Sequence, residues 1–513
     1  MATPSLAMIP SAIADSKVYS VLPNNGDGDF TFNRDSSATR VGQNGLIQTV
    51  GFFGSEEVTN GDFATDTDWT KQAGWTISGG KANASAATGL LYQTMTTTVS
   101  TIYKIEYTIS NYVSGTYNFL LKGAVTPNFS GNGTFTVYLT SGGNANANFI
   151  IDGSAFTGSI DNVSVKEVTG DQPRLNYDIS NGVVQSCPSL LLEPASTNSL
   201  VYSEDFSNAA WIKTSATVES GFVSPDGTLN ADLLQLTLAG GNIYDGVGGS
   251  GDYSFSVFAK YKDAQYIRLR STGSYAYFDI QNGVLGSTIN VINTKIENYG
   301  NGWYRCSVIG NNTNALAQIY VSDTDGSNTG TGGVYLYGAQ FEAGSYPTSI
   351  IPTTGSSQTR AAETCFGAGT ASTFNSTEGV LFVEMAALSD DTSSKVISIS
   401  DGTASNKIEL FYFNGNSIYI NLTSNGVSQG FLSQVIDIKE NNKVAYSYKL
   451  NDTALWINGV EVATDNTAIM PIGLNILSFS NGTGSNFFYG NTKDIRVYKE
   501  ALTDAQLTVL TTI

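Results

Sequence analysis

Short apolar segments that alternate with polar residues, separated by Gly, Asn, Asp and Pro, run through the whole sequence. Residues 103–109 read YKIEYTI and residues 134–138 read TFTVY. A period of two predicts strands with one buried and one wet face. Asn458-Gly459, within residues 455–462, predicts a tight hairpin turn. We therefore expect an all-β fold with one short C-terminal helix, for which Thr503 is a suitable N-cap.

Composition narrows the class of protein further. The 513 residues allow three or four domains, and only 13% of them are charged, against about 25% in average proteins. The net charge is −19, from 44 acidic and 25 basic residues, so the surface repels phosphate backbones and we expect no nucleic acid partner. No run of about 18 apolar residues occurs, and residues 1–14 lack the basic start of a signal peptide, so we expect no membrane insertion.

The residues that usually carry catalysis are scarce. Histidine is absent, which removes the commonest general base and metal ligand. Cys187, Cys306 and Cys365 are odd in number and widely spaced, so we expect reduced thiols and no disulfide framework or zinc cluster. Glycoside hydrolysis needs only two carboxylates. The strands at residues 380–385, 408–413 and 435–440 show no suitable run of acidic residues, so we expect no enzymatic activity.

Three separated pieces of the sequence resemble a segment common in structural proteins of tailed bacteriophages. About 120 residues separate the first piece from the second, which indicates an inserted domain. The resemblance implies a virion component assembled in the host cytoplasm, with other virion proteins (capsid or tail) as partners. The pieces are FNRDSSATR with NGLIQT (residues 32–40 and 44–49), RLNYD, LLE, TN and YSEDF (174–178, 191–193, 197–198 and 202–206), and GSYPTSIIPTTG with TRAAE (344–355 and 359–363).

Two segments also resemble each other and the jelly rolls of carbohydrate-binding modules. The first opens with Gly61-Asp-Phe63 and Trp69, and the second opens with Glu204-Asp-Phe206 and Trp211. The hairpin LWING at residues 455–459 and the ending LTDA at 502–505 resemble concanavalin A-like (laminin G-like) domains. The expected organisation is an N-terminal arm and attachment segment (1–55), an inserted jelly roll (56–168), a continuation of the attachment segment (169–201), a second jelly roll (202–343), a linker extended over a surface (344–370) and a concanavalin A-like sandwich (371–513).

The jelly-roll resemblance implies two kinds of site. Such modules often hold one structural calcium where the first and last strands meet, which places the candidate ligands at Asn60, Asp62 and Asp161, although turn caps explain the same side chains. Sugar binding needs exposed aromatic rings. We expect core roles for Trp69, Trp211, Trp303 and Trp456, and we name Trp75, Tyr275 and Tyr277 as candidate carbohydrate-binding residues.

The combined expectation is a phage appendage or decoration, a head fibre or a tail-associated protein, that displays β-sandwich modules for host-surface glycan binding. Appendages of this kind are usually trimeric, so we expect a homotrimer. One alternative is a purely structural connector or assembly protein of the virion. Another alternative is a polysaccharide-degrading glycosidase.

Overall fold

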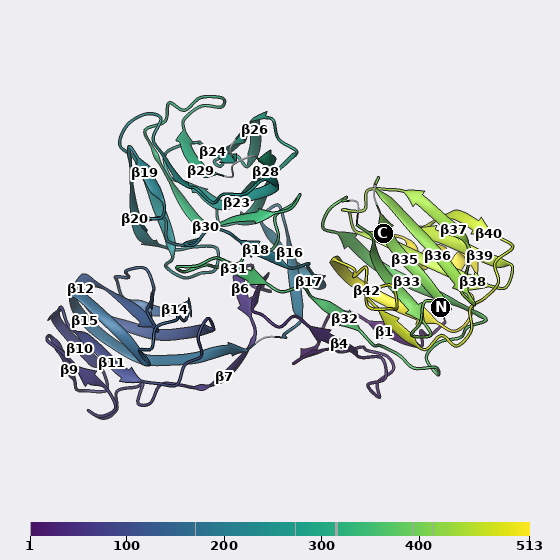
Figure 1. The fold of residues 1–513 in the computed structure, drawn as a ribbon, viewed down its shortest axis with the longest axis horizontal. Coiled ribbons are helices and arrows are strands. Elements are labelled where there is room, and N and C mark those ends of the chain that lie inside the picture. The colour runs from purple at the N-terminus through teal and green to yellow at the C-terminus, as the bar shows by residue number, and fades with distance from the viewer. Residues whose placement is uncertain (1, 170, 272, 313–315, 392, 414) are drawn as a thin grey trace.

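The computed structural model is almost entirely β-structure and confirms the all-β prediction. It describes residues 2–513 except residues 170, 272, 313–315, 392 and 414. Three sandwich modules surround a central region, which we call the hub (residues 13–50, 171–201 and 344–366) (Figure 1). The two jelly rolls lie on one side of the hub and the C-terminal sandwich lies on the other.

The first module is a nine-stranded antiparallel sheet that closes over an aromatic core. The long strands β12 and β15 form its centre and pair along most of their length. The opening strand β7 pairs with the end of β15, as the jelly-roll resemblance implies. Its strands are β7 (Phe52–Glu56), β8 (Thr70–Lys71), β9 (Trp75–Ile77), β10 (Ala82–Ala87), β11 (Leu90–Thr94), β12 (Ile102–Leu121), β13 (Ala124–Val125), β14 (Gly133–Thr140) and β15 (Asn148–Thr169).

The second module has two six-stranded sheets, with the orders β19-β22-β29-β24-β25-β26 and β20-β21-β30-β23-β28-β27. Trp211 and Phe206 are fully buried between them, as expected for the opening motif. The strands are β19 (Ile212–Thr214), β20 (Ala216–Phe222), β21 (Ala231–Leu236), β22 (Asn242–Asp245), β23 (Gly251–Tyr261), β24 (Tyr266–Ser271), β25 (Ser274–Asp279), β26 (Val284–Ile289), β27 (Asn293–Gly300), β28 (Trp303–Asn312), β29 (Ala317–Ser322) and β30 (Gly333–Ala343).

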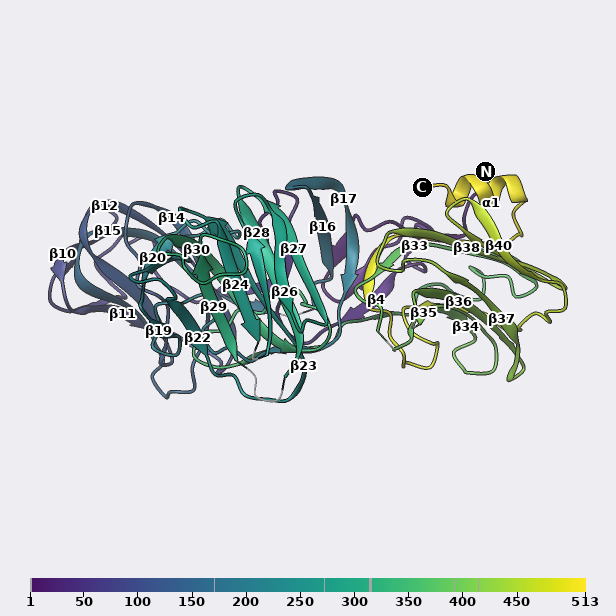
Figure 2. The same ribbon diagram turned by 90° about the horizontal axis from the view of Figure 1, so that it is seen from above.

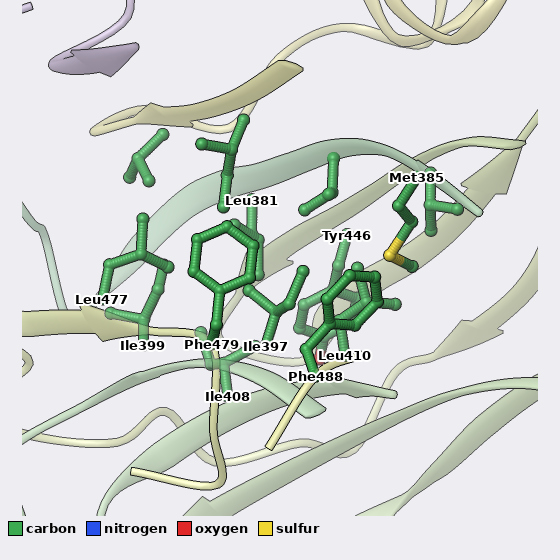
Figure 3. Packing of buried hydrophobic residues seen from close by; sticks show 14 of the residues in the cluster. Leu381, Met385, Ile397, Ile399, Ile408, Leu410, Tyr446, Leu477, Phe479 and Phe488 are labelled. Atoms are coloured by element: carbon green, nitrogen blue, oxygen red, sulfur yellow. The ribbon is translucent and has the colours of Figure 1, made fainter. Parts of the chain in front are cut away.

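The C-terminal sandwich stacks an eight-stranded sheet on a five-stranded sheet. Leucine, isoleucine and aromatic side chains from both sheets meet in its core (Figure 3). Its strands and helix are β33 (Glu378–Ala387), β34 (Lys395–Ser400), β35 (Lys407–Phe413), β36 (Ser417–Ser424), β37 (Val427–Val435), β38 (Asn442–Lys449), β39 (Asp452–Ile457), β40 (Val460–Asp465), β41 (Ile476–Ser478), β42 (Gly490–Tyr498) and α1 (Asp504–Thr511).

Helix α1 covers the outer face of the eight-stranded sheet (Figure 2). Thr503 caps it in a reciprocal capping box with Gln506, which confirms the predicted N-cap. Leu507 and Leu510 pack on Trp456 and Phe382 of the sheet. No helix in the described part of the chain is long and apolar enough to cross a membrane. The five-stranded sheet lies on the side away from α1.

Two segments from far outside the predicted boundary complete this sandwich. Strand β1 (Leu6–Met8) pairs with β42 in the register Leu6 to Val497, and the end of β17 (Val183–Leu192) pairs with β42 in the register Leu190 to Thr492. Leu6, Met8 and Leu190 are buried in the core of the sandwich. Residues 6–8 of the predicted N-terminal arm and attachment segment thus belong to the C-terminal sandwich, because their apolar side chains complete its core.

The hub combines short strands from all three pieces that carry the phage resemblance with β2, β3 and β32, which lie just outside those pieces. They form a four-stranded sheet, β2-β3-β4-β32, and the pairs β5-β6 and β18-β31, while β16 pairs with β17. Its strands, besides β17, are β2 (Ile13–Ala14), β3 (Lys17–Val18), β4 (Phe30–Asn33), β5 (Ala38–Val41), β6 (Ile47–Val50), β16 (Arg174–Ser180), β18 (Ser196–Asn198), β31 (Gln358–Arg360) and β32 (Thr364–Phe366).

A buried network of charges joins these pieces. Glu363 accepts hydrogen bonds from Arg34 Nη1 at 2.9 Å and Arg174 Nε at 2.8 Å, and also pairs with Arg174 Nη2. Glu193 accepts from Arg174 Nη1 at 2.6 Å and lies 3.0 Å from Arg360 Nη1. Arg34, Arg174, Arg360, Glu193 and Glu363 are each 3% exposed or less. The hub therefore holds together through paired charges as well as through apolar side chains, such as Phe30 and Phe32, that join the core of the C-terminal sandwich.

The segment predicted as a surface linker, residues 344–370, is part of this network. Ser349 donates to Glu193 through its backbone N–H and its hydroxyl, at 2.8 and 2.6 Å. Ile350 and Ile351 are buried, and Ile350 packs on Phe258 of the second jelly roll. Residues 344–370 therefore do not run as a linker over a surface, because hydrogen bonds to Glu193 and the burial of Ile350 and Ile351 hold the segment within the structure.

Candidate functional site

Trp75 does not offer a surface for stacking, which corrects its choice as a carbohydrate-binding residue. Its side chain is 5% exposed and its ring lies 5.9 Å from the ring of Phe156. The indole N–H donates to the carbonyl of Gly89 at 2.7 Å. Because both the ring and its polar atom are used inside the first module, Trp75 is a core residue. Trp69, Trp211, Trp303 and Trp456 are also buried, as predicted.

The three candidate calcium ligands lie near the junction of the first and last parts of the first module. The N–H of Val163 donates to the carbonyl of Gly61 at 2.8 Å, so the two segments meet. The amide of Asn60 is used within its own loop, where it donates to the carbonyls of Thr65 and Thr67.

The two acidic candidates each accept a local backbone hydrogen bond. Asp62 accepts from Ala64 at 3.3 Å and Asp161 accepts from Asn162 at 2.7 Å. No group of three or more His, Cys, Asp or Glu side chains suited to a metal occurs among the described residues. Calcium at this junction stays a prediction, since backbone carbonyls would have to supply part of the ligand set.

Tyr275 and Tyr277 both lie on β25 and point away from the core of the second module. Tyr275 is half-buried. Tyr277 is 3% exposed and its hydroxyl donates to Asn328 at 2.9 Å. Both rings lie beside the guanidinium of Arg268, at 4.9 and 5.8 Å from their centroids. The structure thus places the two tyrosines together, around an arginine that the sequence reading did not single out.

A second cluster of aromatic rings lies on the five-stranded sheet of the C-terminal sandwich. Ile408, Leu410 and Tyr412 of β35 point into the core, so Phe411 and Phe413 point outward. We call this outward cluster the aromatic face; it consists of Lys407, Glu409, Phe411, Phe413, Tyr419, Asn421 and Phe431.

Rings on the aromatic face are arranged in order across the strands. Phe411 pairs with Tyr419 on β36, and their rings stack with centroids 5.3 Å apart and an interplanar angle of 13°. Phe413 meets Tyr419 edge-on at 6.2 Å. Phe431 on the edge strand β37 is 61% exposed. Phe411, Phe413 and Tyr419 are half-buried beside it, and stacking against a ligand is one use for such a group of rings on an outer sheet face.

Polar groups flank these rings. Glu409 accepts hydrogen bonds from Lys407 at 2.6 Å and Asn421 at 3.0 Å, and Ser428 donates to Asn421 at 2.8 Å. Residues 480–487 cover the β34 end of the sheet, where Ser398 donates to the carbonyl of Ser480. The β36–β37 end carries the exposed ring of Phe431. A flat ring beside fixed amide and carboxylate groups is the arrangement that binds the apolar face and the hydroxyls of a sugar.

The sequence held a signal for this cluster that was not used. Alternation in residues 407–413 assigns Phe411 and Phe413 to the face opposite Ile408 and Leu410. The five tryptophans, which are the more obvious candidates for stacking on sugars, are all buried. The sequence could not show which of the two sheets α1 covers.

A cleft of about 790 Å³ also lies where the hub, the second jelly roll and the C-terminal sandwich meet. Its charged side chains are largely paired, as in Lys493 with Asp178 at 2.9 Å and Lys295 with Glu297 at 2.8 Å. Paired charges have less hydrogen-bonding capacity left for a ligand. We therefore place the candidate site on the aromatic face and not in this cleft.

Comparison with solved structures gives several matches, each covering less than a third of this chain. The carbohydrate-binding module CBM40 of the Ruminococcus gnavus IT-sialidase is 21% identical, over 29% of this chain and 88% of that chain, with a TM-score of 0.26. Domain 4 of AbnA, a GH43 extracellular arabinanase from Geobacillus stearothermophilus in complex with arabinotriose, is 16% identical, over 29% and 73%, with a TM-score of 0.25. A heptameric SAP-like pentraxin from Limulus polyphemus is 14% identical, over 26% and 68%, with a TM-score of 0.21.

A search of curated proteins gives no match. The sequence model of the Concanavalin A-like lectin/glucanases superfamily matches residues 381–508. This range contains most strands of the C-terminal sandwich and most of helix α1, and it includes the aromatic face. The C-terminal module is therefore a concanavalin A-like domain, as its hairpin and its ending led us to expect.

Proposed function

We propose that this protein is a structural appendage or decoration of a tailed-phage virion that binds host-surface glycans through its β-sandwich modules. One observation carries the binding part of the proposal. The concanavalin A-like domain presents the aromatic face, with Phe431 exposed and Phe411 stacked on Tyr419, on the sheet that α1 does not cover. The chemistry is stacking and hydrogen bonding to sugars, without turnover.

The virion part of the proposal is supported by the resemblance and by what the resembling residues do. Arg34, Arg174, Glu193, Arg360 and Glu363 all belong to the pieces shared with phage structural proteins, and they form the buried network of the hub. A rigid hub that orients three modules suits a protein built for display. We propose other virion proteins as partners and a homotrimer as the assembled state. Repetition on the particle would raise avidity far above the affinity of one site.

Glycan-array binding of the full-length chain tests the binding function. Phe431→Ala removes an exposed ring and should weaken binding of the best neutral glycan at least about tenfold, the equivalent of about 1.4 kcal/mol. Phe366→Ala, which removes a ring that is 42% exposed in the hub, is the matched control and should bind normally. Equal binding by both variants and the parent chain would refute a site on this face.

Three further measurements address the other parts of the proposal. Electron microscopy of phage particles with an antibody to this chain should label the head or the tail, and mass photometry should show three copies per assembly. Reducing-sugar release from capsular polysaccharide should stay at background. Labelled particles combined with an empty glycan array would favour a purely structural connector, and sugar release would favour a glycosidase.

A further inference from the structure

The second jelly roll carries a separate cluster that the proposed neutral-glycan site does not use. Ile267, Leu269, Ala276, Phe278, Ile319 and Val321 of β24, β25 and β29 point into its core. The alternate residues therefore share the outer face of that sheet. We call this cluster the tyrosine–arginine face; it consists of Arg268, Arg270, Tyr275, Tyr277, Gln318 and Tyr320.

Strand register aligns these side chains in two rows. Arg268 lies opposite Tyr277 on one neighbouring strand and opposite Tyr320 on the other. Arg270 lies between Tyr275 and Gln318 in the same way, and its Nη1 donates to Gln318 at 3.2 Å. The other sheet of this module packs its outer face on the hub, through Phe258 and Trp303 against Ile47 and Ile350. The tyrosine–arginine face is therefore the face that the hub does not cover.

Arg268 is held between rings and has no anionic partner in the part of the chain that the structure describes. Its guanidinium carbon lies 3.8 Å from the centroid of Tyr320 and 4.9 Å from that of Tyr275. The residue is 8% exposed, its Nε is enclosed without a hydrogen-bond partner, and no ion pair among the described residues includes it. Rings beside a guanidinium leave the donors at its planar edge free, and these donors fit a carboxylate through two parallel hydrogen bonds.

Carboxylates elsewhere in this module do not fill that role. Asp279 accepts hydrogen bonds from Gln265 at 2.7 Å and from the amide of Asn282 at 2.9 Å. Asp325 accepts from the backbone and the hydroxyl of Ser287, both at 2.8 Å. Arg305, which also has no carboxylate partner among the described residues, differs from Arg268 because it donates to Ser256 at 3.1 Å and to the carbonyl of Thr348 at 2.6 Å. Burying donors without acceptors has an energetic cost that an anionic ligand would remove.

We propose that the tyrosine–arginine face binds a glycan through a carboxylate carried on its sugar ring, as in uronic and sialic acids. The carboxylate accepts from the free edge of Arg268, while the half-buried ring of Tyr275 packs on the sugar. This inference rests on the proposed role in glycan binding, but it assigns a different module and a different class of sugar from the aromatic face.

Isothermal titration calorimetry with the full-length chain tests the inference. The probes are an oligogalacturonate and a sialyl-oligosaccharide, each compared with its methyl ester, and sodium acetate and sodium sulfate as small anions. The acid sugars should bind at least tenfold more tightly than the esters, and their affinity should fall as sodium chloride is raised. Equal affinity of the parent chain for acids and esters, or for acid sugars and acetate, would overturn the proposal.

Variants locate the site. Arg268→Gln should lower affinity for the acid sugars at least tenfold, and Arg268→Lys should restore only part of it because lysine lacks the planar fork. The matched control is Arg496→Gln, since Arg496 also lies over a ring, that of Phe382 at 5.8 Å, but is already paired with Asp494. Unchanged acid-sugar binding in a folded Arg268→Gln variant would also overturn the proposal.

Two outcomes separate this inference from the proposed function. Phe431→Ala should lose neutral glycans and keep the acid sugars, whereas Arg268→Gln should do the reverse. If Arg268→Gln does not fold, two other measurements test the inference. The first compares the affinity of the parent chain for acid sugars and for their esters. The second uses Tyr275→Ala, which removes the half-buried ring and should weaken acid-sugar binding. Equal affinity of the parent chain for acid sugars and their esters, with neutral-glycan binding intact, refutes the inference alone.

Discussion

Replacing Glu363 by Gln should open the hub, because this carboxylate compensates two buried guanidinium groups. Glu363 is 0% exposed and accepts from Arg34 at 2.9 Å, from Arg174 at 2.8 Å and from the backbone of Glu193 at 2.8 Å. Burial lowers the pKa of Arg34, and Glu363 opposes that effect. An amide at this position keeps one acceptor oxygen but removes the charge, and breaking a buried pair in this way costs about 3–5 kcal/mol.

Hydrogen exchange is the suitable measurement, because a protein of several modules need not unfold in one transition. The amides of β17 next to the network, at Leu190 to Leu192, pair with β42 and report on opening of the hub. At about 1.4 kcal/mol for each factor of ten, their exchange should accelerate by roughly 140- to 3,700-fold in Glu363→Gln, if opening of the hub governs it. Amides of β12 in the first module should not change.

The control for this experiment is a carboxylate in an exposed pair. Glu378 lies 3.9 Å from Lys449, with side-chain exposures of 34% and 56%. Such a pair contributes about 0–1 kcal/mol, so Glu378→Gln should leave exchange in β17 nearly unchanged. An acceleration below about fivefold in Glu363→Gln, equivalent to about 1 kcal/mol, would show that the network does not hold the hub together.

Three more predictions concern the side chains of Glu193, Glu204 and Leu6. Burial opposes ionisation of Glu193, but Arg360, Arg174 and hydrogen bonds from Ser349 outweigh burial and hold the pKa of Glu193 at about 2. Because the pKa is lower in the folded state than in the unfolded chain, the stabilisation from Glu193 is complete above about pH 4.5 and should be lost between that pH and about pH 2. Hydrogen exchange in β17 should therefore accelerate on acidification, and a flat profile would contradict this prediction. Burial and, to a smaller extent, Asp226 raise the pKa of Glu204 to about 8, so the folded state keeps a proton that the unfolded chain has released. Calorimetry should therefore show that the second jelly roll loses stability as pH rises from about 4.5 to 8, and that Glu204→Gln loses less. An identical dependence of stability on pH in both proteins would exclude Glu204 as the cause. Leu6→Ala should destabilise the C-terminal sandwich by about 2–5 kcal/mol because Leu6 is 0% exposed. The control is Ile9→Ala, which should cost under about 1 kcal/mol because that side chain is 42% exposed. Equal shifts of the melting temperature in the two variants would mean that β1 does not belong to that core.

Local sequence patterns predicted the elements well, because alternation and turn residues act over a few positions. Asn458 and Gly459 have the positive φ angles, 51° and 86°, that the hairpin turn requires. Thr503 caps α1 as expected. The hub was harder to predict because paired charges and hydroxyls contribute much of its contacts, and residues 344–370 carry only the short apolar pair Ile350-Ile351 as a signal of burial. Pairing of residues 6–8 with β42 depends on contacts across nearly the whole chain, which no local pattern contains.

The candidate sites show the same division. Period-two alternation was enough to place Tyr275 and Tyr277 together on one face and would have placed Phe411 and Phe413 on another. What the sequence could not give is coverage: the hub covers one sheet of the second jelly roll, and α1 covers one sheet of the C-terminal sandwich. Trp75 was misjudged for a related reason, since the carbonyl of Gly89 that holds its indole N–H lies 14 positions away.

Pairing of β1 with β42 also delays completion of the C-terminal sandwich until almost all of this chain has been synthesised. The hydroxyl of Ser5 bonds to the carbonyl of Val497, 492 positions later. At about 5–20 residues per second, a ribosome takes roughly 25–100 s to produce the second partner after the first. During that interval the core that buries Leu6 and Met8 in the folded protein has not yet formed, while the two jelly rolls have time to fold. We expect chaperone dependence during translation, relieved once β42 has emerged, because this strand order pairs residues 6–8 with residues 495–497.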